Sequence, residues 1–316
     1  MFVEPDIMTG CPIPLLYHTA GASNMGSTAH AKITDALKGI PSYIAFRAGH
    51  ISAPAYQTWI ENEGSQKVPS LTEDQLNRSA RFPHDLHIFV SRALAHCRAL
   101  DILPDDRYDP ATIEKAFSDV FSKYNHGRNL TYIFPEESAL LYAIVRIAKP
   151  RHAVFAGSYY GYWGVAAKAA CRDMDTSLID IDPVVMALAS QNFANLGLDQ
   201  NVSFLVDDAE AVIPSLDAID LLVLDATGPA CEEVHMDYRE KAIYFPHLQA
   251  AMARLAPGAL VVAHNVLLEN FTGGRFWEEK KNAYRKQYVK FLALVSADFV
   301  WTVIDSTEGV LVARKR

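Results

Sequence analysis

Residues 152–182 contain the side chains whose types and spacing are best suited to chemistry in this chain of 316 residues. A strand-like run at 152–156 leads into the turn GSYYG at 157–161, where a helix is predicted to begin. Exposed N–H groups and the positive end of the helix dipole at such a turn suit an anionic ligand group. Asp180, at the end of a second strand-like run, is placed to accept hydrogen bonds from ribose hydroxyls. Together they predict a nucleoside-containing cofactor in the crevice at the carboxyl ends of the strands.

The elements that must position this turn alternate regularly after residue 135. Helix 135–149 is followed by strand–helix units, which indicate a parallel sheet covered by helices on both faces, the α/β class. A long amphipathic helix at about 275–293 precedes two final strand-like runs, and the turn at 306–309 between them is typical of an antiparallel hairpin. The parallel strands are predicted at 152–156, 177–181, 202–206, 219–224 and 259–263.

Residues 1–130 show helical periodicity and no clear series of strands. We therefore expect a helical N-terminal domain that acts as a substrate-binding lid, and a cofactor-binding domain at 131–316. Aromatic side chains with polar tips are frequent early in the chain, and that density suits a pocket for a flat, partly polar ligand. An ordinary aromatic core is the alternative. The candidate substrate-binding residues here are Tyr17, His18, Tyr56 and Trp59.

The composition narrows the classes of partner. The formal net charge is −8 and the isoelectric point is about 5.8, so a nucleic-acid partner is not expected. No apolar run approaches the roughly 18 residues that span a bilayer, and the acidic N-terminus is not a secretory signal. The four cysteines are widely scattered, which predicts reduced thiols in a cytoplasmic protein. A homodimer is the default expectation for a soluble oligomer.

Five segments in order resemble the class I S-adenosylmethionine-dependent methyltransferases, and most closely their catechol O-methyltransferase-like branch. The segments are VFAGSYYGYWGVAAKAA, LIDIDPVVMALASQNFANLGL, VSFLVDDAEAVIPSL, DLLVLDAT and GALVVAHNVL, and the resemblance covers about residues 130–316. It implies a Rossmann-like sheet with a C-terminal antiparallel hairpin and S-adenosyl-L-methionine as the cofactor. It also implies that the methionine part of the cofactor is wrapped by Gly157, Ser158, Tyr160 and Gly161, that the ribose is bound by Asp180, and that the adenine lies beside Asp208 and Ala209.

Alternatives stay open for these residues. A nicotinamide-binding Rossmann domain would have the spacing G-x-G-x-x-G, whereas this turn has G-x-x-x-G with two tyrosines inside. Those tyrosines would crowd a pyrophosphate, but aromatic faces attract a cationic sulfonium. Asp208 is equally suited to capping the N-terminus of a helix.

The resemblance breaks at the residues that hold a metal in metal-dependent members of this branch. Those members use an acid after the fourth strand and an Asp-Asn pair after the fifth, and the matching positions here are Asp225, His264 and Asn265. Mg²⁺ prefers hard oxygen ligands, so this set is poor for it and no metal is predicted. The family's catalytic lysine is replaced by Gly228, so the catechol mechanism does not transfer intact.

His264 is predicted to lie at the carboxyl end of a central strand, where the substrate sits. An imidazole there is suited to act as a general base near neutral pH. The alternative is a histidine that packs and hydrogen-bonds without titrating. The predicted catalytic residues are therefore His264 and Asp225, with Asn265 beside the substrate.

These features predict an enzyme that methylates an aromatic small molecule in secondary metabolism. The aromatic helical extension is similar in layout to bacterial natural-product enzymes that methylate tryptophan-derived indoles. An indole C3 acceptor also fits the missing lysine and the poor metal set, because an electron-rich indole attacks a sulfonium without prior O–H ionisation. C-methylation of an indole is therefore the first preference. The alternatives are a phenol or catechol O-methyltransferase and a non-catalytic protein that retains the cofactor site.

Overall fold

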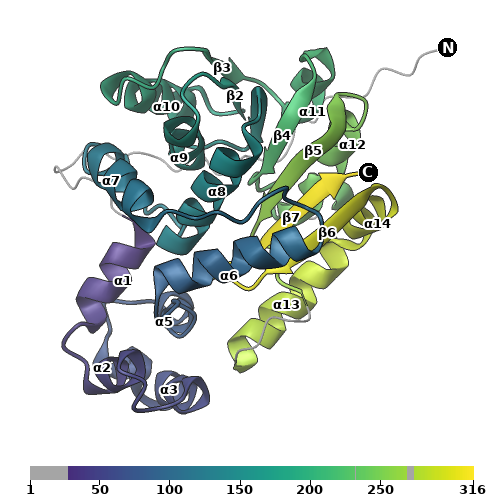
Figure 1. Cartoon of the computed structure of the whole chain (residues 1–316). Helices are drawn as coiled ribbons and strands as arrows, with labels where there is room; N and C mark the ends of the chain where they lie inside the picture. Colours follow the sequence, from purple (N-terminus) through teal and green to yellow (C-terminus); the bar gives the residue numbers. More distant parts are fainter. Residues whose placement is uncertain (1–27, 232, 269–273) are drawn as a thin grey trace.

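A seven-stranded sheet forms the centre of the protein in the computed structural model, which describes residues 28–231, 233–268 and 274–316 (Figure 1). The strand order is β3-β2-β1-β4-β5-β7-β6, with β1 to β5 parallel and β7 antiparallel to both β5 and β6. The predicted α/β sheet with a terminal hairpin is confirmed. The strands are β1 (His152–Ala156), β2 (Asp175–Asp180), β3 (Val202–Val206), β4 (Ile219–Leu224), β5 (Leu255–His264), β6 (Phe299–Ile304) and β7 (Val310–Lys315).

Helices cover both faces of this sheet. Successive strand residues point to opposite sides, and both sets of side chains are apolar, so each face packs against a layer of helices. In β1, Ala153 and Phe155 face one hydrophobic cluster, while Val154 and Ala156 face the other. The first cluster includes residues of α6 (Leu86–Ala99), α7 (Pro110–Phe121), α8 (Pro135–Ala148), α9 (Tyr162–Ala170) and α10 (Pro183–Asn195). The second includes residues of α11 (Ala209–Val212), α12 (Tyr244–Ala251) and α14 (Val289–Asp298).

The N-terminal helices pack around their own small core. This third cluster gathers residues between Ala29 and Phe82, and Phe134 joins it from the start of α8. By contrast, α6 and α7 share the core of the sheet although they precede residue 130. The domain boundary at 130/131 stays a prediction, and the packing instead separates the first helices from α6 onward. Those first helices are α1 (Ala29–Leu37), α2 (Pro41–Arg47), α3 (Ala53–Trp59), the π-helix η1 (Ile60–Gly64), α4 (Ser65–Lys67) and α5 (Glu73–Ser79).

The predicted helix at 275–293 is two helices, α13 (Arg275–Gln287) and α14. Tyr288 stands at the break, is fully buried, and donates a hydrogen bond from its hydroxyl to the carbonyl of Asn265. This anchor fixes the end of α13 close to the carboxyl end of β5. Short 3-10 helices complete the fold at η2 (Ile213–Ser215), η3 (Met236–Tyr238) and η4 (Glu240–Ile243).

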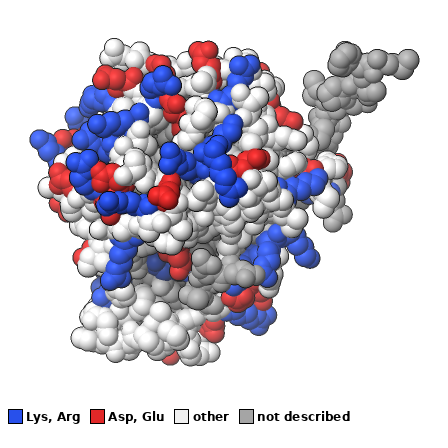
Figure 2. All heavy atoms as spheres, turned by 45° about the vertical axis from the view of Figure 1, so that its right-hand side comes forward, with Lys and Arg blue, Asp and Glu red and all other residues white. Residues whose placement is uncertain are grey.

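The described residues also bear on cysteine chemistry and surface charge. Cys97 and Cys171 are free, but Cys231 is disulfide-bonded, so the prediction of reduced thiols is wrong for that residue. We find no helix in the described ranges with the length and apolarity to cross a membrane. On the face in Figure 2, blue and red side chains are interspersed rather than separated into fields of one sign.

Candidate active site

The turn after β1 is shaped by two glycines in the left-handed region. Gly157 and Gly161 have φ of 79° and 80°. A side chain on Gly157 would overlap the backbone of Ala226, and one on Gly161 would come within 2.9 Å of Phe193. Both glycines are therefore required by packing, because the turn passes directly against the end of β4 and against α10.

The backbone of this turn is bonded inside the protein. The N–H groups of Gly157 and Ser158 both donate to the carbonyl of Ile179 at 3.0 Å, and Gly161 donates to the carbonyl of Ser158. These groups therefore shape the crevice rather than facing an anionic ligand group, contrary to the expectation for them. The Ser158 hydroxyl points to α10, 3.3 Å from the sulfur of Met186.

Asp180 ends β2 beside the turn, as predicted. Its Oδ2 accepts a hydrogen bond from the Tyr159 N–H at 2.9 Å, and burial raises the pKa of its carboxyl group. Next to it lie two exposed apolar side chains that the sequence analysis did not single out, Ile181 and Val206, which are 55% and 49% exposed. An acid for ribose hydroxyls beside an apolar surface for a flat base suits an adenosine group. The local signal was an apolar residue placed at each strand end.

The two tyrosines of the turn are held by the segment that precedes α8. The hydroxyl of Tyr124 donates to the carbonyl of Tyr160 at 2.7 Å, and the Asn129 amide donates to the hydroxyl of Tyr159 at 2.6 Å. Tyr160 is 6% exposed and Tyr159 is 38% exposed, with their ring centres 4.0 Å apart. Tyr159, which was not among the predicted contacts, therefore has the more accessible ring.

Asp208 caps α11 through a hydrogen bond from the N–H of Glu210 at 2.8 Å, which is the alternative role considered for it. Ala209 is buried in the core on that face. Contact of these two residues with adenine stays a prediction.

The second half of the site begins where β4 ends. The N–H of Asp225 donates to the carbonyl of Ala156 at 3.0 Å, which joins Asp225 to the end of β1. Asp225 directly precedes Ala226, which lies against Gly157 of the cofactor turn. His264 ends β5 and lies across from Asp225, with its Nδ1 3.1 Å from Oδ1 of that carboxylate. The structure thus brings the two predicted catalytic residues together.

His264 is enclosed by two carboxylates. Its Nε2 lies 2.9 Å from Oε2 of Glu137, and the whole side chain is buried. Carboxylates only accept hydrogen bonds, so both ring nitrogens carry protons and the ring is an imidazolium. Burial opposes this charge, but the charges of Glu137 and Asp225 outweigh burial and raise the pKa of His264 to about 10. A ring in this state has no free lone pair, so the geometry does not favour the predicted role of general base.

Lys241 supplies a second buried cation beside Asp225. Its Nζ donates to the carbonyl of Ala226 and to the hydroxyl of Tyr244, each at 3.1 Å, and lies 3.6 Å from Oδ1 of Asp225. Burial lowers the pKa of Lys241, and Asp225 partly offsets that effect. Sequence spacing could not indicate this residue, because η4 is separated from the end of β4 by a long irregular segment.

Two adjacent glutamates in the first turn of α8 hold the hairpin turn. Oε1 of Glu137 accepts hydrogen bonds from the hydroxyl of Ser306 and the N–H of Glu308, each at 2.8 Å. Oε1 of Glu136 accepts one from the N–H of Thr307 at 3.1 Å. Burial and the neighbouring Glu137 raise the pKa of Glu136 to about 7. Neither acid was among the predicted site residues.

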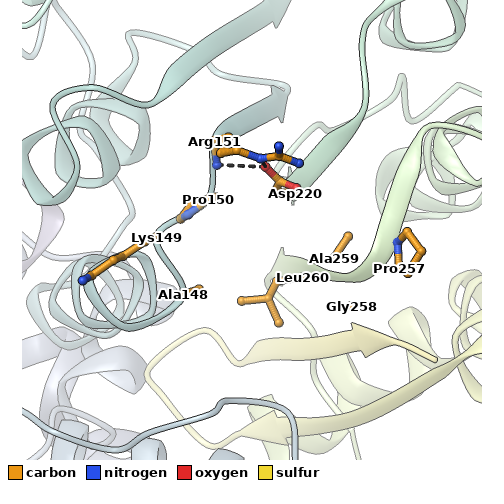
Figure 3. Close-up of a pocket in the computed structure, with 9 residues that line it drawn as sticks. All are labelled: Ala148, Lys149, Pro150, Arg151, Asp220, Pro257, Gly258, Ala259 and Leu260. Atoms are coloured by element: carbon orange, nitrogen blue, oxygen red, sulfur yellow. Dashed lines mark hydrogen bonds and ion pairs between the residues drawn. The ribbon is translucent and has the colours of Figure 1, made fainter.

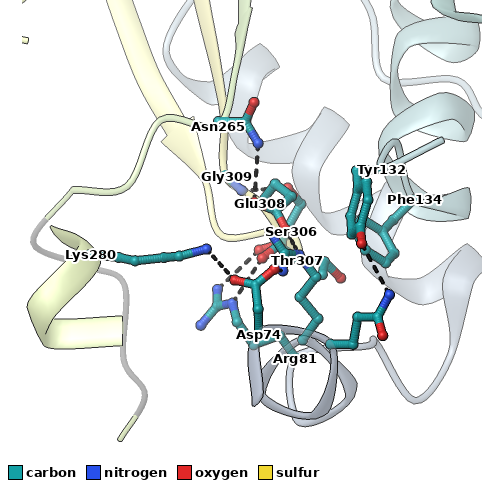
Figure 4. A network of polar contacts seen from close by, with 12 residues as sticks. Asp74, Arg81, Tyr132, Phe134, Asn265, Lys280, Ser306, Thr307, Glu308 and Gly309 are labelled. Atoms are coloured by element: carbon teal, nitrogen blue, oxygen red, sulfur yellow. Dashed lines mark hydrogen bonds and ion pairs between the residues drawn. The ribbon is translucent and has the colours of Figure 1, made fainter. Parts of the chain in front are cut away.

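Glu308 links this turn to the N-terminal helices and to β5. It forms an ion pair with Arg78 of α5, and the Asn265 amide donates to its Oε2 at 3.1 Å (Figure 4). Burial would raise the pKa of Glu308, but the charge of Arg78 outweighs burial and lowers it. Figure 4 also shows Arg81, which follows α5, and Lys280 of α13 at the same network. Arg81 forms an ion pair with Asp305, and Lys280 forms one with Asp74.

The other predicted substrate residues lie elsewhere. Tyr56 is fully buried in the N-terminal core and bonds to Ser79, and Trp59 stacks on it at 5.5 Å. Their contact with a substrate stays a prediction without support from this packing. Tyr17 and His18 lie outside the described residues.

A hollow of about 270 Å³ lies at the amino ends of the central strands. Figure 3 shows the residues that line it. It is lined by residues such as Lys149, Arg151 and Asp220, and contains no predicted site residue. Because it opens at the opposite edge of the sheet, it is not part of the site described above.

Known proteins match the part of the chain that contains this site. A family profile described as "Methyltransferase domain" matches residues 154–266. Among solved structures, the chain is similar to the O-methyltransferase TomG of Streptomyces achromogenes in complex with SAM, at 17% identity and a TM-score of 0.46, covering 73% of this chain and 98% of TomG. It is also similar to the SAH-bound methyltransferase PaMTH1 of Podospora anserina, at 15% identity and a TM-score of 0.47, covering 71% and 94% of the two chains.

A curated relative gives the decisive match. A probable O-methyltransferase of Mycobacterium tuberculosis is 32% identical over 179 residues, which are 56% of this chain and 71% of the relative. The chain belongs to the class I S-adenosylmethionine-dependent methyltransferases. It is an enzyme of their catechol O-methyltransferase-like branch, and its cofactor is S-adenosyl-L-methionine.

The geometry of the methyltransferase fits that cofactor. Asp180 can hold the ribose hydroxyls, and Ile181 and Val206 offer the base an apolar surface. The individual contacts assigned to Gly157, Ser158, Tyr160 and Gly161 stay predictions. In the part of the chain that the structure describes, no three His, Cys, Asp or Glu side chains are grouped as a metal site.

Proposed function

We propose that this methyltransferase transfers a methyl group to a hydroxyl oxygen of a small aromatic molecule. The observation that carries the proposal is the position of Asp225. Asp225 directly precedes the residue that lies against the cofactor turn, its side chain is 24% exposed, and its carboxylate is held by His264 and Lys241. A partly exposed carboxylate held in one orientation suits the hydrogen bond of an acceptor hydroxyl. The relative from Mycobacterium tuberculosis is named as a probable O-methyltransferase, which supports oxygen as the acceptor.

The chemistry required of the protein is modest. When bound, S-adenosyl-L-methionine supplies an electrophilic methyl group on a sulfonium. Asp225 accepts the hydrogen bond of the substrate hydroxyl, orients an oxygen lone pair, and takes the proton as the new C–O bond forms. The methyl–sulfur bond would break in the same displacement, with its electron pair leaving on the sulfur of the demethylated cofactor. Alignment of this kind contributes up to about 7–11 kcal/mol in favourable cases, and general-base assistance contributes roughly 10²–10⁴-fold in rate.

Methylation of indole C3 remains a second candidate from the sequence. The hydrogen bond to Asp225 does not distinguish it, because an indole N–H can donate to the same carboxylate. The absence of a free nitrogen on His264 removes the base that we expected to assist it. Oxygen methylation is therefore the better supported acceptor chemistry.

The biological setting is a separate part of the proposal. A role in secondary metabolism, a cytoplasmic location, a homodimer and the lack of a nucleic-acid partner are proposals from composition and resemblance. The mixed charges on the face in Figure 2 are consistent with a small-molecule substrate, because a polyanion would favour a continuous basic surface.

The test combines cofactor labelling with one substitution. Methyl-labelled cofactor is incubated with a panel of phenols, catechols and indoles, and the labelled atom is located by mass spectrometry and NMR. We expect label on oxygen, and we expect Asp225→Asn to reduce turnover by about 10²–10⁴-fold. Calorimetry should show that the same variant binds the cofactor normally. Label on indole carbon alone, or full turnover by the variant, would reject the proposal.

A further inference from the structure

Three carboxylates around the ends of β4 and β5 each face a cation from the protein. Asp225 faces His264 and Lys241, and Glu137 faces His264 from the opposite side. Glu308 faces Arg78. These three acids come from three separate parts of the chain, and their neutralisation is therefore a property of the assembled site.

We propose that the His264 imidazolium is a built-in cation that takes the place of a divalent metal ion, so that this methyltransferase works with an organic cation between Asp225 and Glu137. In the resemblance, the position of His264 belongs to a carboxylate that would help to hold Mg²⁺. Here the same position bears positive charge, and a carboxylate from α8, that of Glu137, lies on its far side. This inference deepens the proposed function and rests on it for the role of Asp225.

The donor atoms that remain do not suit a divalent ion. Both nitrogens of His264 point at carboxylates, so neither has a lone pair for a metal. The Asn265 amide nitrogen points at Glu308, which leaves its oxygen and the outer oxygen of Asp225 as candidate ligands. Mg²⁺ requires near-octahedral oxygen coordination, and any ion near these two oxygens would meet the charges of His264 and Lys241. The residues present therefore do not fit the metal.

The arrangement also explains what Glu137 does. Oε1 of Glu137 bonds to the hairpin turn and Oε2 bonds to the N–H of Phe134 and to His264, so its position is fixed at both oxygens. Glu137 thus locates the imidazolium, and the imidazolium locates Asp225. We assign Glu137 and His264 as positioning residues, since neither is exposed to a substrate.

The test asks whether a metal site appears when the cation is removed. Mn²⁺ binding is measured by electron paramagnetic resonance and calorimetry on four full-length proteins: wild type, Glu137→Gln, His264→Asp, and the double variant. We expect no saturable Mn²⁺ binding by the wild type or by Glu137→Gln, which is the matched control that keeps the imidazolium. The double variant should bind Mn²⁺ saturably, roughly tenfold or more above the detection limit that bounds the wild type, because it restores a carboxylate without adding a third acid.

Two further measurements distinguish a metal site at Asp225 from unrelated Mn²⁺ binding. Adding Asp225→Asn to the double variant should abolish the gained binding, and chelator should leave wild-type turnover unchanged. If His264→Asp alone does not fold, the wild-type and double-variant measurements still decide. Saturable Mn²⁺ binding by the wild type that Asp225→Asn removes would overturn the inference, as would a folded double variant without any gain. Because the readout is metal binding, a failure here is distinguishable from an incorrect methyl acceptor.

Discussion

Replacing His264 with asparagine should destabilise the protein by several kcal/mol. The substitution removes the charge that neutralises Glu137 and Asp225 and leaves two carboxylates about the same buried space. Breaking a buried ion pair by removing one partner typically costs about 3–5 kcal/mol. The rise in the pKa of His264 from 6.5 to about 10 corresponds to roughly 5 kcal/mol as an upper value, which agrees in scale.

The stability difference between wild type and His264→Asn should depend on pH in a definite direction. Because the pKa of His264 is raised on folding, the folded protein holds the proton more tightly than the unfolded chain. The stabilisation is complete below the unfolded value of 6.5, declines as pH rises from there, and is lost as pH passes about 10. The free-energy difference between wild type and His264→Asn should therefore shrink as the pH is raised from 6 to 10, by the amount that this ionisation contributes.

Urea unfolding followed by circular dichroism at a series of pH values measures this difference. His247→Asn is the matched control, because His247 is also buried but burial lowers its pKa to about 4. Its folded form is neutral, so its loss should show no dependence on alkaline pH. A cost below about 1 kcal/mol for His264→Asn, or equal pH profiles for the two variants, would refute a buried imidazolium.

The remaining predictions concern the cofactor turn and the hairpin turn. Asp180→Ala should weaken cofactor binding by about 10–100-fold in calorimetry, from lost hydrogen bonds to a charged group, and unchanged affinity would contradict its role. Gly157→Ala should cost at least ~1–2 kcal/mol and impair cofactor binding, whereas Gly39→Ala, with nothing within 4 Å of the added carbon, should be near neutral in the same thermal assay. In the wild type, the free energy of unfolding should fall as pH rises from 4.5 to about 7, because folding raises the pKa of Glu136 and its ionisation therefore disfavours the folded state. Glu136→Gln should remove this fall. A fall of the same size in urea unfolding of the variant would disprove the prediction.

The sheet and its cofactor edge could be predicted because their signals are local. Alternating strand–helix units, glycines in a turn and an acid at the end of a strand are read within a few residues of one another. Asp180 was therefore found correctly at the end of β2. The prediction for Gly157 and Gly161 was incomplete, because the residues that crowd them, Ala226 and Phe193, are distant in sequence.

The acceptor half of the site was harder to predict because its contacts span the chain. Asp225 and His264 were identified from the family resemblance, and His264 also from its place at a strand end. The charge of His264, however, depends on Glu137, which lies 127 residues earlier. Without that partner, an imidazole at a strand end is expected to titrate near neutral pH. Lys241 was missed for the same reason, since only the folded loop after β4 brings it to Asp225.

Methyl transfer to an oxygen that is hydrogen-bonded to Asp225 is the central step proposed for this enzyme. The most direct measurement is a single-turnover reaction with methyl-labelled cofactor, run on the wild type and on Asp225→Asn with the same hydroxylated aromatic acceptors. We predict label on the acceptor oxygen with the wild type and a rate lowered by about 10²–10⁴-fold in the variant, at equal cofactor occupancy. Label on carbon, or equal rates for the two proteins, would contradict it.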